Sequence, residues 1–122
     1  MLKENGNLPT VTDVLVLGSG IAGHCAALAA AEAGAEVLLL EKSSQPGGSS
    51  AIAGGAFVFC GTEEQEAAGQ RDSLDALRQD LLESGKNKNN PELIERFLES
   101  QLETYSFLKR HGVRFQLHIV PE

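Results

Sequence analysis

The chain has 122 residues, of which 42% are hydrophobic and 22% charged, a composition typical of one globular domain. Its formal net charge of −7 argues against nucleic-acid binding or an anionic membrane surface, which would need clustered Lys and Arg. Two cysteines without a C-x-x-C motif indicate neither a disulfide framework nor a metal site. No signal peptide and no long apolar run is present, so the sequence predicts no membrane span and a cytoplasmic location.

The first half of the chain predicts a strand, a helix and a second strand. A polar leader at 1–12 precedes DVLVL at 13–17, which is apolar at successive positions, as in a strand buried on both faces of a parallel sheet. The alanine-rich segment 21–34 predicts a helix that ends at Gly34, and EVLLL at 36–40 predicts a second buried strand. Together they form one βαβ unit, so the predicted fold class is α/β.

The second half predicts two helices and a further strand. Residues 61–71 are polar and predict a loop, after which Asp72 can cap a helix over 72–84. A longer helix opens with an Asn-Pro pair and runs over 90–110, and the alternating run at 113–120 predicts a strand. Apolar side chains recur along one stripe of each helix and are expected in the core: Leu74, Leu77, Leu81, Ile94, Phe97, Leu98, Leu102, Tyr105 and Leu108.

Three glycines follow the first strand with the spacing G-x-G-x-x-G, in GSGIAG. Gly18 would allow a tight turn, Gly20 the approach of phosphates to the backbone, and Gly23 close packing of helix on strand. The N-terminus of such a helix carries about half a positive charge and suits a pyrophosphate. Glu41 ends the second strand, where its carboxylate can accept hydrogen bonds from both ribose hydroxyls. The pattern predicts a dinucleotide site, and Glu41 argues against a 2′-phosphate.

The residues that follow Glu41 discriminate between a nicotinamide and a flavin dinucleotide. A nicotinamide-binding domain usually continues into another amphipathic helix, whereas this chain continues with QPGGSSAIAGG at 45–55. A segment with few Cβ atoms and many N–H and hydroxyl groups can line the rest of a long cofactor, which favours FAD. A nucleotide-binding module without activity and an NAD-binding domain remain the alternatives.

The segment VLVLGSGIAGHCAALAAAEAGAEVLLLEKSSQPGGSSAIAGGAF resembles the flavoprotein family of fumarate reductase, succinate dehydrogenase and 3-ketosteroid dehydrogenase, and the resemblance extends to the end of the chain. It implies a Rossmann-like FAD-binding domain that is incomplete in residues 1–122. Residues 13–60 would form the βαβ unit and flavin loop, and residues 72–110 a helical segment. The remaining FAD domain and the substrate-capping domain would lie outside this chain, so that this segment alone would be inactive.

The resemblance also implies the residues that bind the cofactor. The pyrophosphate would be held by Gly18, Ser19, Gly20, Ala22 and Gly23. At the adenosine end, Glu41 would bind the ribose and Lys42 would lie beside the adenine. The second glycine-rich loop would contact pyrophosphate and ribityl chain through Gly48, Ser49 and Ser50, and the flavin ring through Ala53, Gly54 and Gly55. The membrane-complex members attach flavin through a His in this loop; no His lies between His24 and His111 here, so the FAD should be non-covalent.

The activity implied by the resemblance is hydride transfer between the flavin N5 and a C–C bond next to a carbonyl or carboxylate. The substrate would be a small molecule that is ketosteroid-like or fumarate-like, and the electron partner stays open. No catalytic acid or base is assigned within the chain. His24 is expected to be a helix residue away from the flavin, and Cys25 and Cys60 are expected to be packing residues.

Overall fold

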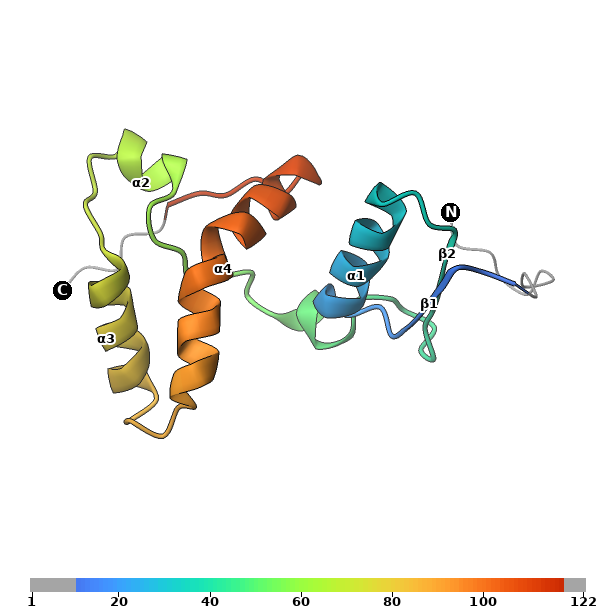
Figure 1. Ribbon diagram of the computed structural model, residues 1–122, viewed down its shortest axis with the longest axis horizontal. Helices are drawn as coiled ribbons and strands as arrows, with labels where there is room; N and C mark the ends of the chain where they lie inside the picture. Colours follow the sequence, from blue (N-terminus) through green and yellow to red (C-terminus); the bar gives the residue numbers. More distant parts are fainter. Residues whose placement is uncertain (1–10, 118–122) are drawn as a thin grey trace. The chain divides into compact units, whose positions relative to one another are not determined.

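The computed structural model describes residues 11–117, and the chain divides into two compact units, Met1–Ala56 and Phe57–Glu122 (Figure 1). None of the helices within residues 11–117 is long and apolar enough to cross a membrane.

The first unit is a parallel βαβ arrangement. Strand β1 (Val14–Leu17) pairs in parallel with strand β2 (Val37–Leu40), and the first residues of the two strands lie opposite each other. Helix α1 (Ile21–Glu32) connects the strands and packs against both. A short 3-10 helix, η1 (Gly48–Ile52), follows in the glycine-rich segment. The predicted α/β fold class with a parallel sheet is confirmed.

Helix α1 ends as its sequence predicts. Gly34 has φ +87°, and its N–H donates to the carbonyl of Ala31 at 3.0 Å, while Ala35 N–H reaches back to Ala30 O at 3.1 Å. This pair of bonds satisfies the last carbonyls of the helix and requires a left-handed residue, which glycine supplies without strain. The chain then turns into β2.

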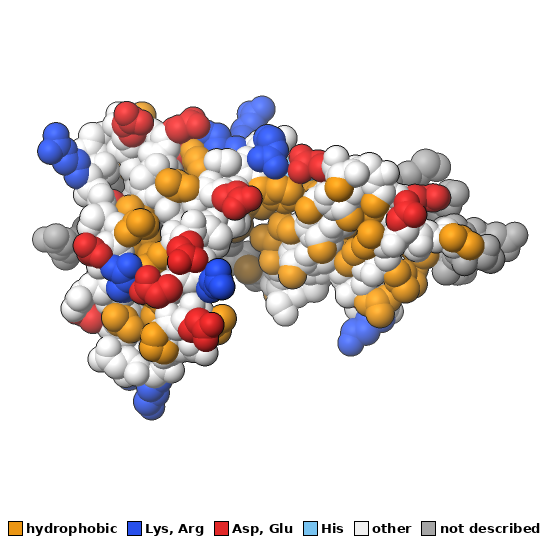
Figure 2. Space-filling view, in the orientation of Figure 1, with side chains coloured by type: hydrophobic (Ala, Val, Ile, Leu, Met, Phe, Trp, Pro, Cys, Tyr) orange, Lys and Arg blue, Asp and Glu red, His pale blue; other side chains and the backbone are white. Residues whose placement is uncertain are grey.

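One face of the two-stranded sheet is covered by α1 and the other is open. Val16 faces the helix, because a Cβ atom on Gly23 would lie 3.5 Å from its Cγ1. Side chains alternate along a strand, so Leu15 and Leu17 point to the opposite face, where they are 53% and 75% exposed. The apolar runs predicted burial on both faces, but in this unit α1 is the one helix packed on the described strands. Figure 2 shows hydrophobic side chains on the surface of this unit.

The second unit contains three helices: α2 (Glu63–Ala67), α3 (Leu74–Ser84) and α4 (Pro91–Arg110). Helices α3 and α4 pack side by side (Figure 1). Their apolar stripes form the core as predicted, around a buried cluster of Cys60, Leu77, Ile94 and Leu98 with Leu81, Leu82 and Phe97 packed against it. The expectation that Cys60 is a packing residue is confirmed. Leu74 and Leu102, predicted in the core, are instead 44% and 42% exposed.

Helix α2 lies in the segment that was expected to be a loop. Thr62 caps it: its hydroxyl accepts from Gln65 N–H, and the Gln65 side chain accepts from Thr62 N–H at 3.0 Å. This reciprocal capping box stabilises a five-residue helix that has no apolar stripe of its own. The T-x-x-Q spacing in the sequence is the signal for it, and the prediction of a loop was wrong over Glu63–Ala67.

The caps of the longer helices agree with the sequence in one case and differ in the other. Asn90 caps α4 as predicted, with its Oδ1 accepting from the N–H groups of Glu92 and Leu93. Helix α3 is capped by Ser73, whose Oγ accepts from Ala76 N–H at 3.1 Å, and not by Asp72. The Asp72 carboxylate instead accepts from the Ser73 N–H at 2.7 Å, one residue outside the cap position.

The strand predicted at 113–120 is absent over residues 113–117, and the remainder of that range lies outside the described residues. A strand needs a neighbour for its ladder of hydrogen bonds, and this unit has no strand to offer among its described residues. Phe115 instead packs in an aromatic cluster, with its ring centroid 5.6 Å from those of Phe57 and Phe59 and 5.1 Å from that of Tyr105.

A buried glutamine fixes the segment that opens the second unit. Gln101 of α4 is 2% exposed, and its amide both accepts from the Cys60 N–H and donates to the Cys60 carbonyl, each at 3.0 Å. The side chain thus satisfies the two backbone groups that a neighbouring strand would otherwise satisfy. Cys60 can therefore be buried without belonging to a sheet.

Candidate functional site

The turn between β1 and α1 requires two of its three glycines for folding alone. Gly18 has φ +96°, a conformation that other residues rarely adopt, and its N–H donates to Leu40 O at 2.7 Å at the end of β2. A Cβ atom on Gly23 would overlap the carbonyl oxygen of Gly18 and lie 3.0 Å from its carbon. The close approach predicted for Gly23 is therefore present.

Gly20 differs from its two neighbours, because the fold does not require a glycine there. It is the N-cap of α1 with φ −65° and ψ 177°, an extended conformation open to any residue. A Cβ atom on Gly20 would meet nothing within 4 Å. The open space lies at the N-terminus of α1, which has no side-chain cap and no acidic residue in its first turn. An anionic group fits there, held by N–H groups and favoured by the helix dipole.

The second glycine-rich loop lies against this turn. Ser50 Oγ accepts from Ile21 N–H at 3.2 Å, which places η1 at the start of α1. A Cβ atom on Gly48 would lie 3.7 Å from the Cα atom of Gly20. That distance is an ordinary van der Waals contact, but Gly47 and Gly48 have φ of +109° and +53°, so the backbone of this loop favours glycine at both positions. Two loops that are separate in the sequence thus flank one open space.

Glu41 joins both loops through Ser19. The Oε2 atom of Glu41 accepts from the Ser19 N–H at 2.9 Å and from the Ser19 Oγ at 2.6 Å. Ser19 Oγ in turn accepts from the Gly47 N–H at 3.0 Å. The other carboxylate oxygen, Oε1, accepts from the Ser43 N–H at 2.8 Å. The ends of both strands and the second loop therefore meet at one carboxylate.

These hydrogen bonds keep Glu41 ionised. The Ser19 hydroxyl, followed by the backbone N–H groups of Ser43 and Ser19, lowers the pKa of the carboxyl to about 2. A carboxylate offers about four acceptor positions, of which Ser19 uses two and the Ser43 N–H one, while the Ser43 hydroxyl adds the weakest of the interactions that lower the pKa. Glu41 can therefore accept a further hydrogen bond from a hydroxyl donor, which is what a ribose offers.

The structure brings together part of the set of residues predicted from the sequence. The two glycine-rich loops and Glu41 form one cluster, which contains Gly18, Ser19, Gly20, Gly23, Glu41, Gly48 and Ser50. Ala22 lies next to it in the first turn of α1. Ser49 is exposed beside them. Lys42, Ala53, Gly54 and Gly55 are exposed. The Ala53 N–H donates to the Ser50 carbonyl at 3.4 Å, which ends η1. The roles of all these residues toward a cofactor stay predictions.

Sequence reasoning missed Gly47 and Ser43, both of which bind the cluster through backbone N–H groups. The signal in the sequence was the Gly47-Gly48 pair, because consecutive glycines indicate a backbone with positive φ, which both residues adopt. His24 is exposed on α1, and its Nδ1 lies 3.2 Å from Gly20 O. Cys25 is half-buried rather than buried.

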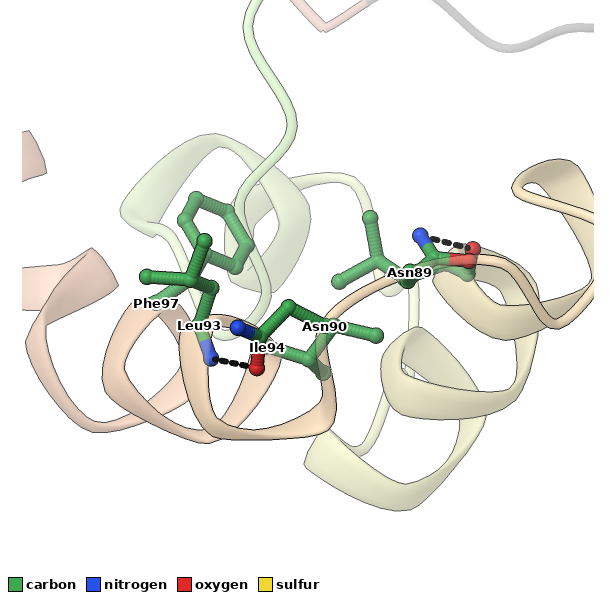
Figure 3. A pocket seen from close by; sticks show the side chains of 6 residues that line it. Asn89, Asn90, Leu93, Ile94 and Phe97 are labelled. Carbon is green, nitrogen blue, oxygen red and sulfur yellow. Dashed lines mark hydrogen bonds between the residues drawn. The ribbon is translucent and has the colours of Figure 1, made fainter.

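A second hollow lies between α3 and α4 in the other unit (Figure 3). It has a volume of about 290 Å³ and is lined by Leu81, Asn89, Asn90, Leu93, Ile94 and Phe97. Asn90 Oδ1 caps α4, and Asn89 Nδ2 donates to Leu81 O at 3.1 Å, while the buried Oδ1 of Asn89 has no hydrogen-bond partner among the described residues. The hollow carries no titratable or nucleophilic side chain, so it offers a gap in apolar packing and no chemistry.

The contrast between Gly23 and Gly20 gives a stability prediction. We expect Gly23→Ala to lower the free energy of unfolding by about 1–3 kcal/mol, because its Cβ atom would force α1 away from the Gly18 carbonyl. Gly20→Asn should leave the free energy of unfolding within about 1 kcal/mol of wild type, because the space is open and Asn is a good N-cap. Urea unfolding of the two variants measures this, and equal destabilisation would contradict it.

Residues 13–121 match the family model described as an FAD-binding domain. The chain is 38% identical over 113 residues to an NADH:fumarate oxidoreductase of Klebsiella pneumoniae (strain 342), which covers 91% of this chain and 12% of that protein. It is 40% identical over 87 residues to a urocanate reductase of Eggerthella lenta, covering 71% of this chain and 14% of that protein. This chain therefore spans less than one sixth of the length of either relative.

Solved structures give the same result. A 3-ketosteroid-Δ4-(5α)-dehydrogenase from Rhodococcus jostii RHA1 has a TM-score of 0.76 at 39% identity, over 86% of this chain and 22% of that one. The open conformation of a flavocytochrome c3 fumarate reductase has a TM-score of 0.75 at 36% identity, over 83% of this chain and 18% of that one. These matches support the resemblance drawn from the glycine-rich segments, and the residues around Gly20 and Glu41 fit the cofactor of the matched family. The chain belongs to the FAD-binding domain family, and its cofactor is FAD.

Proposed function

We propose that this chain is the N-terminal part of the FAD-binding domain of a flavin-dependent oxidoreductase. The short share of each relative that the chain spans, 12% and 14% for the two reductases above, supports this placement. On this proposal the rest of the FAD domain and a substrate-capping domain lie outside residues 1–122. The full-length protein, and not this segment alone, would be the active enzyme.

The observation that carries the proposal is the open space at Gly20. A fold that needed only a tight turn would use Gly18 and Gly23 and leave Gly20 free to vary, since its backbone suits any residue. A glycine there is explained by a pyrophosphate that approaches the backbone at the start of α1. In this arrangement Ala22, Gly48, Ser49 and Ser50 would surround the same group.

The two ends of the cofactor would extend from this point in opposite directions. Glu41, with acceptor capacity on Oε1, would bind the adenosine ribose, and Lys42 would lie beside the adenine. Ala53, Gly54 and Gly55 would lie against the flavin ring. A Cβ atom on Gly54 or Gly55 would meet nothing within 4 Å, so the backbone there is open to a flat ring. Bound FAD would supply the hydride chemistry.

The substrate class follows from what the relatives are named for. Fumarate, urocanate and acrylate each have a C=C bond conjugated with a carboxylate, and the reductases named for them are among the relatives of this chain. The structural neighbour named a ketosteroid dehydrogenase points to a C–C bond next to a ketone. We therefore propose that the protein adds or removes hydrogen across a C–C bond next to a carboxylate or carbonyl of a small molecule. We place the catalytic acid or base outside residues 1–122, as the family resemblance implies.

The full-length protein tests this proposal through its absorption spectrum. We expect the purified protein to show flavin absorbance, and the reduced flavin to be reoxidised by an α,β-unsaturated acid such as fumarate or urocanate, or by an α,β-unsaturated ketosteroid. After precipitation by acid or heat, the FAD should appear in the supernatant, because no His lies between His24 and His111 to hold it covalently. Absence of flavin after incubation with FAD would contradict the function, and colour in the pellet would contradict non-covalent binding.

Replacement of Glu41 separates the adenosine end of the site from the flavin end. We expect Glu41→Ala in the full-length protein to weaken FAD binding roughly ten- to hundredfold, because the ribose loses a charged acceptor. FMN has no adenosine, so its affinity should change much less. Titration of the apoprotein with each flavin measures both, and equal losses would place Glu41 away from the ribose.

A further inference from the structure

Ser19 has every polar group except its carbonyl engaged within the protein. Its side chain is fully buried, at 0% exposure, in a unit where α1 contains no buried residue. Its N–H and its hydroxyl both donate to Glu41 Oε2, at 2.9 and 2.6 Å, and the hydroxyl accepts from Gly47 N–H at 3.0 Å. Neither the N–H nor the hydroxyl is left to bind a phosphate, although the sequence led us to expect Ser19 in contact with it.

The Ser19 hydroxyl hydrogen-bonds both Glu41 and Gly47. Any residue at position 19 would offer its N–H to Glu41, but a hydroxyl can donate to the carboxylate and accept from Gly47 at the same time. It therefore links three segments: the turn after β1, the end of β2 and the start of the second glycine-rich loop. Gly47 lies 28 residues from Ser19 in the chain, so the link is a tertiary one.

We propose that Ser19 is a positioning residue of the cofactor site, whose hydroxyl sets Glu41 and the Gly47–Ser50 segment in place before the cofactor binds. This inference rests on the proposed function. A glutamate side chain at the end of a strand has several rotamers, and ordering it on binding would weaken affinity. The bond from Ser19 holds Oε2 of Glu41, the Ser43 N–H holds Oε1, and the carboxylate fixed in this way would accept from the ribose.

A double-mutant cycle in the full-length apoprotein tests the inference, with FAD and FMN as the two probes. We expect Ser19→Ala to weaken FAD binding about five- to twentyfold, and FMN binding several-fold less, because the adenosine end depends on Glu41. In the Glu41→Ala background, Ser19→Ala should then weaken FAD no more than it weakens FMN, because the residue through which it acts is gone.

A matched control separates positioning from general stability. Thr12→Val removes a hydroxyl from the same unit, at the opposite end of β1, where it donates to Glu36 O at 2.6 Å. We expect it to lower the midpoint of thermal unfolding without changing the ratio of FAD to FMN affinity. If Ser19→Ala does not fold, Ser19→Cys, which keeps the volume but hydrogen-bonds weakly, provides the same comparison.

Two results would overturn the inference while leaving the proposed function intact. One is an equal loss of FAD and FMN affinity in Ser19→Ala, and the other is additive losses in the double variant. A Thr12→Val variant that shifts the FAD to FMN ratio as much as Ser19→Ala would equally assign the effect to stability. A wild-type protein that binds neither flavin would overturn the proposed function, and this inference with it.

Discussion

The hydrogen bonds between Ser19 and the Glu41 carboxylate hold together the parts of the site that the chain contributes. Parallel strands have their carboxyl ends at the same edge of a sheet, so the turn after β1 and the end of β2 must meet there. Two N–H groups and one hydroxyl converge on Glu41, which keeps it a carboxylate far below neutral pH. The carboxylate thus binds the backbone of the turn after β1 and of Ser43 at the end of β2.

The three glycines of the motif are required for different physical reasons. Gly18 is fixed by its backbone conformation, and Gly23 by the contact with the Gly18 carbonyl that brings α1 onto the sheet. Of these three glycines, Gly20 is the one for which the described residues give no reason for a missing side chain. The motif can in this way be divided into two residues that build the turn and one that, on the proposed function, leaves room for the ligand.

Much of the first unit could be predicted from the sequence, because its signals are local. The apolar runs before Gly18 and Glu41 predict β1 and β2, and the alanine-rich segment that ends at Gly34 predicts α1. The structure of the 113–117 segment could not be predicted in this way. Its alternating pattern suggests a strand, but a strand needs a partner strand, and Phe115 instead packs in an aromatic cluster. Within the site, the motif predicts Gly18, Gly20, Gly23 and Glu41. The orientation of the Ser19 hydroxyl and the role of Gly47 depend on loops 28 residues apart that meet only in the folded chain.

On the proposed function, the space beside Gly20 serves the pyrophosphate of FAD and not the fold. The most direct test is to titrate the full-length apoprotein with FAD, for wild type and for Gly20→Asn. The unfolding midpoint of each protein is measured on the same sample. The account predicts that Gly20→Asn unfolds at the wild-type midpoint and loses FAD binding. A variant that folds normally and binds FAD with wild-type affinity would contradict it.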